Sequence, residues 1–427
     1  MSTVVYLLTG DVGGTNSRMS LYKLKEETPV VVKTYRNATS IPKDKLGHPN
    51  VFIDYIVQPF LDFCWNEQTD CRLIDDPSYV TIVACIASAG VVANNQVRLT
   101  NLGNMLICGN SIQKNTSSPL MKCIVRCMII NDFVAQGYGC LTLKKSEVQH
   151  MHGPDTVFST SSSSNLNQLA GPKVCVGAGT GLGECYLTQS VHAEPGDDPY
   201  SCFPSEGGHV EYAPRNDLEV ELFQYLTKKL QSHHRISVER VVSGKGLANV
   251  YGFLAQKFPK KIVKSVHDEF LQAGDQQGRV VATNATPGSL CLQAMEIFAS
   301  AYGCEVGSAA IKWIPTGGLF VTGGLTPKNM KFIHGKDTEF MKSYLHKGRV
   351  SPILERVPLY AVLTEDLGVR GARKAALMAY EIYSHSAPSK DPTFSSFWSS
   401  PTFTNILTAV AAAVGSSLAV ALVNRKK

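Results

Sequence analysis

Two glycine-rich turns in the sequence carry residue types that can surround a phosphate group. Residues 10–16 contain Asp11 and Thr15 beside three glycines, and residues 177–183 contain Thr180 beside four. Because glycine has no Cβ, its backbone N–H can approach phosphate oxygens closely, and a carboxylate beside such a turn can hold hydrated Mg²⁺. Neither turn matches the Walker pattern GxxxxGK(S/T) or opens a Rossmann unit, since each leads into another apolar strand. Either turn alone is explained equally well as a plain hairpin.

A carboxylate stands directly after the apolar run of residues 122–130, in the sequence Asn131-Asp132-Phe133. Side chains at the carboxyl ends of strands form the active sites of open α/β sheets, so Asp132 is a candidate base for the proton of an attacking hydroxyl. The competing interpretation is that Asp132 caps the helix that begins at Phe133. The local sequence leaves both interpretations open.

A flexible polar segment later in the chain, residues 206–209 (Glu-Gly-Gly-His), suits hydrogen bonding to a polyol, and we call it the bracket. A metal site formed by Glu206, His209 and Glu211 is the alternative, but no HExxH pattern or cysteine partner supports it. Glu239, further along the chain, is either a sugar ligand or an exposed charge on a helix.

The composition describes an ordinary folded protein with room for two domains. Of 427 residues, 44% are hydrophobic and 18% are charged, which excludes the disordered and fibrous classes. The net charge of +6 is spread thinly, so nucleic acid is not an implied partner. The twelve cysteines form no CxxC pair, and no signal peptide precedes the first strand-like run, so we expect reduced thiols in the cytosol.

Hydrophobic periodicity predicts an α/β chain built from two similar halves. Each half opens with a strand, a glycine-rich turn and a second strand, which indicates a duplicated architecture with a ligand cleft between the halves. Strands are expected at residues 4–8, 19–24, 80–87, 122–130, 174–176 and 319–322. Helices are expected at residues 51–65, 217–231 and 290–313.

The motifs taken together carry a family resemblance. The matching stretches are residues 10–18, 129–133, 177–183, 206–210, 238–244 and 320–324. In this order they resemble the bacterial-type, non-ROK glucokinases of the sugar kinase/Hsp70/actin superfamily, over residues 4–380. The resemblance implies a two-lobed, actin-like (ribonuclease H-like) ATPase fold with a cleft between a small and a large α/β domain. It also implies transfer of the terminal phosphoryl group of ATP to the 6-hydroxyl of glucose.

The same resemblance implies roles for individual residues. Asp132 is similar to the family's catalytic base, and Asp11 to the residue that positions Mg²⁺ through water. The expected glucose ligands are Asn101, Asn131, Asp132, Glu206, His209 and Glu239. The expected ATP-binding residues are Asp11, Gly13, Gly14, Thr15, Asn16, Gly179, Thr180, Gly181, Gly323 and Gly324. A homodimer also fits the family.

Domain boundaries follow from the resemblance, with a small domain at residues 1–140 that is completed by about 362–383, and a large domain at 141–361. Residues 86–90 (Ile-Ala-Ser-Ala-Gly) depart from the Gly-Pro or Cys-Pro of many relatives, and residues 192–204 form a longer segment than in compact bacterial members. The longer segment leaves open a kinase of another hexose. A membrane-tethered sugar sensor without catalysis is the rival from a different functional class.

A hydrophobic tail lies beyond the part of the chain that the resemblance covers. After a Ser/Pro linker at residues 384–403, residues 406–423 are 18 uncharged positions, followed by Arg425-Lys426-Lys427. This length meets the lower limit for a transmembrane helix, and the basic end can contact lipid headgroups. We expect residues 404–427 to anchor a cytosol-facing kinase in an organelle membrane, with the mitochondrial outer membrane favoured over the peroxisome or endoplasmic reticulum. A helix packed on the kinase is the alternative.

Overall fold

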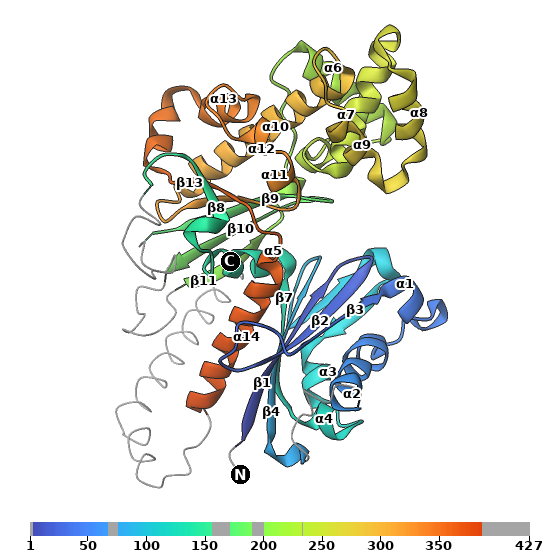
Figure 1. The fold of residues 1–427 in the computed structure, drawn as a ribbon, viewed down its shortest axis with the longest axis vertical. Helices are drawn as coiled ribbons and strands as arrows, with labels where there is room; N and C mark the ends of the chain where they lie inside the picture. Colours follow the sequence, from blue (N-terminus) through green and yellow to red (C-terminus); the bar gives the residue numbers. More distant parts are fainter. Residues whose placement is uncertain (1–2, 67–75, 156–170, 190–199, 233, 387–427) are drawn as a thin grey trace, which may run out of the picture. The chain divides into compact units, whose positions relative to one another are not determined.

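Two mixed β-sheets, each accompanied by helices, form the framework of the protein (Figure 1). The computed structural model describes residues 3–66, 76–155, 171–189, 200–232 and 234–386. The residues up to Met378 form one compact unit, which contains both sheets. The expected α/β class is therefore confirmed.

The first sheet has five strands: β1 (Val4–Val12), β2 (Asn16–Lys23), β3 (Val31–Arg36), β4 (Val80–Ser88) and β7 (Ile124–Asn131). Their order is β3-β2-β1-β4-β7. β1 pairs antiparallel with β2 and parallel with β4, and β4 pairs parallel with β7. Eight of the nine residues of β4 are buried, as expected for a parallel strand covered on both faces.

The second sheet repeats this pattern and adds one strand. Its strands are β8 (Val148–His152), β9 (Lys173–Ala178), β10 (Leu182–Gln189), β11 (Tyr200–Ser205), β12 (Leu319–Thr322) and β13 (Leu359–Val362). The order is β11-β10-β9-β12-β13-β8, with antiparallel pairing of β9 to β10 and parallel pairing of β9 to β12 and of β12 to β13. The duplication predicted from the two strand–turn–strand units is therefore present in the topology. A separate hairpin joins β5 (Gln96–Leu99) to β6 (Met105–Cys108).

The longer helices match the periodicity of the sequence. The expected helix at residues 51–65 is helical from Val51 to Asn66, with a π-helical stretch at Ile53–Val57 that leads into α2 (Gln58–Asn66). The other α-helices of at least seven residues in the described part are α5 (Asp132–Cys140), α6 (Asp217–Lys229), α7 (Gly244–Lys257), α8 (Lys264–Gln272), α9 (Gln277–Thr283), α10 (Leu290–Trp313), α13 (Glu339–Leu345) and α14 (Leu367–Ser386). Residues Gly348–Arg356 form a 3₁₀ helix. The short ones are α1 (Asn37–Ser40), α3 (Gly109–Lys114), α4 (Pro119–Lys122), α11 (Leu325–Lys328) and α12 (Met330–Ile333).

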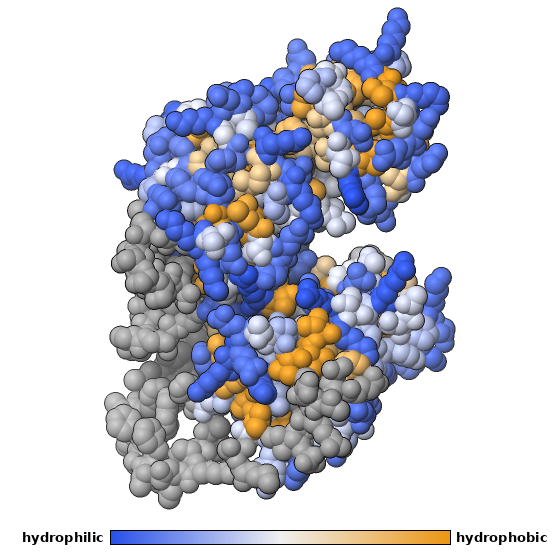
Figure 2. All heavy atoms as spheres, viewed as in Figure 1, coloured by the Kyte–Doolittle hydropathy of each residue, from blue (hydrophilic) through white to orange (hydrophobic). Residues whose placement is uncertain are grey.

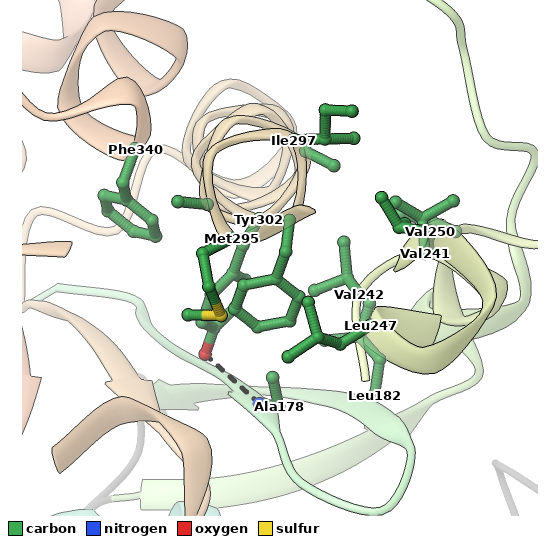
Figure 3. Close-up of a cluster of buried hydrophobic side chains, with 14 of the residues drawn as sticks. Ala178, Leu182, Val241, Val242, Leu247, Val250, Met295, Ile297, Tyr302 and Phe340 are labelled. Atoms are coloured by element: carbon green, nitrogen blue, oxygen red, sulfur yellow. Dashed lines mark hydrogen bonds between the residues drawn. The ribbon is translucent and has the colours of Figure 1, made fainter. Parts of the chain in front are cut away.

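Alternate residues of β9 serve two different cores, because successive side chains of a strand point to opposite faces. Val174 and Val176 belong to the core that contains α10, whereas Cys175 belongs to the core that contains residues of α5. Figure 3 shows the first of these cores, where the hydroxyl of Tyr302 on α10 accepts a hydrogen bond from Ala178 N at 3.1 Å. The second sheet is therefore packed against α10 on one face and α5 on the other (Figure 1).

Helices α5 and α14 approach each other so closely that only glycine fits at the crossing. A Cβ on Gly139 of α5 would lie 2.2 Å from Leu367 O, and a Cβ on Gly371 of α14 would lie 1.6 Å from Ala135 O. Both distances are shorter than any non-bonded contact can be. The backbone of α14 thereby fixes the position of the helix that begins at Asp132.

The predicted tail at residues 404–427 and most of the predicted linker lie outside the described residues, as does the first part of the longer segment, residues 192–199. Within the described ranges, no helix is both long enough and apolar enough to cross a membrane. On the face drawn in Figure 2, the described residues present a mainly hydrophilic surface, with apolar side chains in small groups.

We predict that Gly371→Ala destabilises the protein by about 1–3 kcal/mol, because the new methyl group must push α14 away from Ala135. In an uncrowded helix the same change stabilises by up to about 1 kcal/mol, so the sign of the effect is diagnostic. The measurement is the free energy of unfolding in urea. Gly368→Ala is the matched control on the same helix, since its Cβ would meet nothing closer than 4.0 Å. Equal effects of the two substitutions would contradict the close crossing.

Candidate active site

The carboxyl ends of three parallel strands meet at one edge of the first sheet. The register places Val12 of β1 beside Ser88 of β4, and Ser88 beside Asn131 of β7. Asp11 and Asp132 therefore stand at the same edge, although they are far apart in the sequence. This edge is where ligands bind in open α/β sheets.

The residue that caps α5 is Asn131. Its Oδ1 accepts hydrogen bonds from Phe133 N at 2.8 Å and Val134 N at 3.3 Å. Its Nδ2 donates to Gly90 O at 3.1 Å. Asp132 lies one residue further, in the first turn, where its Oδ1 accepts a bond from Phe133 N at 3.0 Å. The interpretation of Asp132 as the cap is therefore wrong, because Asn131 is the last residue with extended backbone and holds that position.

Two other carboxylates, Asp11 and Glu206, influence Asp132. Burial raises the pKa of Asp132, and the negative charges of Asp11 and Glu206 raise it further, against the hydrogen bond from Phe133 N. Burial also raises the pKa of Asp11, opposed by the nearby charge of Arg18. A carboxylate with a raised pKa is a stronger base than an ordinary one, so Asp132 is suited to accept a proton.

The first glycine-rich turn is held in place by a buried asparagine. Gly13 N donates to Asn16 O at 2.9 Å within the turn. The side chain of Asn37, which is 1% exposed, donates to Gly13 O at 2.9 Å and accepts from Ser17 Oγ at 2.7 Å. Thr15, at the tip, is exposed, and its backbone oxygen accepts a hydrogen bond from Asn37 N at 2.9 Å. No motif in the sequence singles out Asn37, because both partners of its side chain lie 20 or more residues away.

The second glycine-rich turn is supported by Glu239. The Oε2 atom of Glu239, which lies in the 3₁₀ turn Val238–Arg240, accepts a hydrogen bond from Leu182 N at 3.0 Å. The same atom would lie 2.6 Å from a Cβ on Gly181. On the other side, Gly244 N at the start of α7 donates to Gly179 O at 2.8 Å. Glu239 is thus a contact of this turn and not an exposed helix charge.

Other glycines of these motifs are required by packing. Gly177 and Gly183 are partners across β9 and β10, and Cβ atoms there would lie 3.0 Å and 2.1 Å from the ring of Phe133. Gly323, after β12, has φ +81°, and its Cβ would lie 2.3 Å from Ala178 O. These three positions therefore need no ligand to explain their glycine.

The bracket is a tightly packed segment. Glu206 and His209 are exposed, with Oε2 and Nε2 3.8 Å apart. Gly207 and Gly208 between them are buried. A Cβ on Gly207 would lie 2.2 Å from Oε2 of Glu184, and one on Gly208 would lie 1.9 Å from a backbone oxygen of β10. The glycines thus allow the bracket to lie directly on β10, and the expectation of flexibility is wrong for this reason.

The other residues singled out in the sequence are the alternative metal ligands, Asn101 and Gly324. The alternative metal site does not form, since no group of three His, Cys, Asp or Glu side chains in the described residues could hold a metal ion. Glu211 instead lies 4.0 Å from Arg235. Asn101 belongs to the 3₁₀ turn Thr100–Leu102, and its side chain lies outside the described part. Gly324 follows β12 and forms the N-cap of α11.

Comparison of sequences gives consistent matches. A family model described as "Glucokinase" matches residues 8–379. A glucokinase from a Nostoc species is 33% identical over 387 residues, which cover 87% of this chain and 98% of the relative. A glucokinase from a Synechocystis species is 33% identical over 385 residues with the same coverage, and one from Shigella dysenteriae is 28% identical over 369 residues.

Comparison of structures gives the same fold. Glucokinase from Balamuthia mandrillaris, solved in complex with glucose, matches with a TM-score of 0.65 at 19% identity, over 87% of this chain and 94% of that chain. Leishmania braziliensis glucokinase matches with a TM-score of 0.62 at 16% identity, over 88% and 93%. The two-lobed sugar kinase fold is thereby established.

We predict that Asp11→Asn lowers the pKa of Asp132, because the substitution removes a negative charge that holds that pKa up. The measurement is an NMR titration of the aspartate side-chain carboxyl carbons. Asp275→Asn removes an exposed charge elsewhere and serves as the matched control, which leaves the pKa of Asp132 unchanged. An unchanged Asp132 titration in folded Asp11→Asn would contradict the proximity of the two carboxylates.

Proposed function

This chain belongs to the glucokinase family, and from that premise we propose that it transfers the γ-phosphoryl group of ATP to the 6-hydroxyl of glucose. The observation that carries the proposal is the position of Asp132. It stands at the start of α5, beside Asp11, and its neighbour Phe133 packs on the strands of the second glycine-rich turn. The bracket lies near this base, since the negative charge of Glu206 raises the pKa of Asp132.

In the proposed reaction, Asp132 accepts the proton of the glucose 6-hydroxyl as the hydroxyl oxygen attacks the γ-phosphorus. The bond between that phosphorus and the bridging oxygen of ADP breaks in line with the attack, which gives glucose 6-phosphate and ADP. Most of the catalysis comes from holding the two substrates in position, an effect of about 7–11 kcal/mol in favourable cases.

ATP is proposed to lie between the two glycine-rich turns, with Mg²⁺ entering as part of the nucleotide substrate. The expected contacts are Asp11, Gly13, Gly14, Thr15 and Asn16 from the first turn, Gly179, Thr180 and Gly181 from the second, and Gly323 and Gly324 after β12. Burial raises the pKa of Asp11, and a nearby hydrated cation would relieve that cost. Mg²⁺ would neutralise negative charge on the phosphate oxygens of ATP.

Glucose is proposed to contact Asn101, Asn131, Asp132, Glu206, His209 and Glu239. Two of these side chains already make hydrogen bonds within the protein, which limits the number that they can make to glucose. Asn131 uses its oxygen for the helix cap and one N–H for Gly90, so one N–H remains for a sugar hydroxyl. Glu239 uses Oε2 for Leu182 N, so Oε1 remains. We therefore propose that Asn131 acts as a donor and Glu239 as an acceptor.

We propose that residues 1–140 and about 362–383 form a small domain and that residues 141–361 form a large one. Supporting this division, every strand of the first sheet lies before residue 140, and every strand of the second lies between 148 and 362.

We predict that Asp132→Asn lowers kcat by about 10²- to 10⁴-fold, the usual contribution of a general base. Glucose affinity, measured by titration calorimetry, should change little because Asn has the same shape and keeps the hydrogen bond from Phe133 N. Asp275→Asn is the control and leaves kcat unchanged. Near-normal turnover in a folded Asp132→Asn protein would exclude Asp132 as the base.

We also propose that residues 406–423 anchor the protein in a membrane, with the mitochondrial outer membrane as the expected address. The support is the run of 18 uncharged residues with a basic end. The test is alkaline carbonate extraction of membranes from cells that express the full chain. Val414→Lys with Leu418→Lys should release the protein, because each lysine near the centre of the span costs about 2.5–3.5 kcal/mol of insertion free energy. Thr404→Lys is the control. Release of the unsubstituted chain would exclude the anchor.

A further inference from the structure

Two buried glutamates that the proposed reaction does not use face each other behind the bracket. Glu184 comes from β10 and Glu305 from α10, and their residues are 4% and 7% exposed. The Oε1 atom of each is buried without a hydrogen-bond partner among the described residues. Each carboxyl influences the titration of the other. Two buried carboxylates at close range cannot both ionise without a large cost, so such a pair holds one proton between its oxygens.

The surrounding charges decide which glutamate carries the proton. Lys312 Nζ lies 3.8 Å from Oε1 of Glu305, and the charge of Lys347 also favours the ionised form of Glu305. Burial, followed by the charge of Glu305, raises the pKa of Glu184 to about 8. Of the two, Glu184 is therefore the one whose protonated form is favoured. The charge of Lys312 also reaches Glu184 and opposes this rise of its pKa, but it is the smaller effect. The other titratable groups that face Glu184 are Cys175 and Tyr302, which are both buried.

The protonated glutamate supports the bracket directly. Glu184 pairs across β10 and β11 with Ser205, the residue before Glu206. Its Oε2 atom occupies the space beside Gly207, where a Cβ would lie only 2.2 Å away. The backbone of the bracket thus lies directly against the Glu184 carboxyl.

We propose that Glu184 is a positioning residue for glucose: joined to Glu305 by a shared proton, it fixes the backbone of Gly207 and so aims Glu206 and His209 at the sugar. The inference rests on the proposed glucose site. Glu184 acts through the bracket and does not itself touch substrate, so its loss should affect glucose binding more than the chemical step.

The sign of the pH dependence follows from the raised pKa. An unfolded glutamate titrates near 4.5, and Glu184 in the folded protein titrates at about 8. The stability that the proton contributes is complete below the lower value and is lost as pH rises to the higher one. Above about pH 8 both carboxylates are charged, they repel each other, and the bracket loses its support.

The experiment compares the wild type, Glu184→Gln and Glu184→Ala between about pH 7 and about pH 9, a window that spans the titration. In the wild type, KM for glucose should rise about five-fold or more with pH while kcat changes less, as expected when ground-state binding is lost. Glu184→Gln, which mimics the protonated acid, should remove the rise. Glu184→Ala should show a raised KM throughout. Glu269→Gln, an exposed acid on α8, is the matched control and should behave as the wild type.

Hydrogen exchange at the amides of residues 207–210, without substrate, separates this inference from the proposed function. Faster exchange in Glu184→Ala, and in the wild type above about pH 8 beyond the intrinsic base catalysis, supports the positioning role even if glucose is not phosphorylated. Exchange that matches Glu269→Gln in every variant would overturn the role of Glu184. A glucose KM in an active enzyme that is the same in Glu184→Ala and the wild type would overturn it as well.

Discussion

The ring of Phe133 lies against Gly177 and Gly183, a cross-strand pair in which a side chain would crowd the ring at Gly177 and overlap it at Gly183. This contact joins the two halves of the proposed site. Phe133 follows Asp132 directly, at the point where the chain leaves the first sheet, and the glycines flank the turn that contains Thr180. Burial of an aromatic side chain contributes up to about 1.5–3 kcal/mol. The larger consequence is geometric, because the ring sets the distance between the candidate base and the second glycine-rich turn.

Further contacts of α5 keep that geometry from relaxing. Thr322 Oγ1 on β12 donates to Oε1 of Gln136 at 3.0 Å, and Cys140 packs with Cys175 in the core below. The crossing with α14, at Ala135 and Gly139, holds an adjacent side of the helix. The carboxylates of Asp132, Asp11 and Glu206 are unfavourable for folding, because Asp132 is buried and the three negative charges repel one another. The packing of α5 offsets this unfavourable free energy. Packing elsewhere in the helix stabilises an arrangement that the charged groups alone would not adopt.

Much of the fold follows from local sequence pattern. The helix at residues 290–313 has the predicted limits, because Ser289 caps its start and accepts a hydrogen bond from Leu292 N. The buried strand at residues 80–87 is explained by its apolar run. The parts of the site that could not be predicted depend on contacts between distant residues. Asn37 reaches across to the first turn, Glu239 reaches the second, and Glu184 meets Glu305 only after α10 has packed on the second sheet.

The cap of α5 shows a different limit of sequence analysis. Asn131 and Asp132 are both favourable capping residues, and a shift of one residue at the end of β7 exchanges their roles. The strand register settles the matter, because it places Asn131 beside Ser88 as the last paired residue. Asp132 then falls in the first turn, where only one carboxylate oxygen is needed by the backbone. The assignment that leaves Asp132 available for chemistry is thus a result of sheet pairing, which no local pattern contains.

The glycines of the two turns separate into those that the protein requires and those that it does not. Gly177, Gly183 and Gly323 have neighbours that leave no room for a Cβ. Gly179 is different, since among the described residues nothing lies within 4 Å of its Cβ position, and for Gly13 the nearest atom is 3.9 Å away. Neither residue has φ in the left-handed region. Packing within the described residues gives no reason for glycine at these two positions, which is consistent with the proposal that a nucleotide phosphate approaches the backbone there.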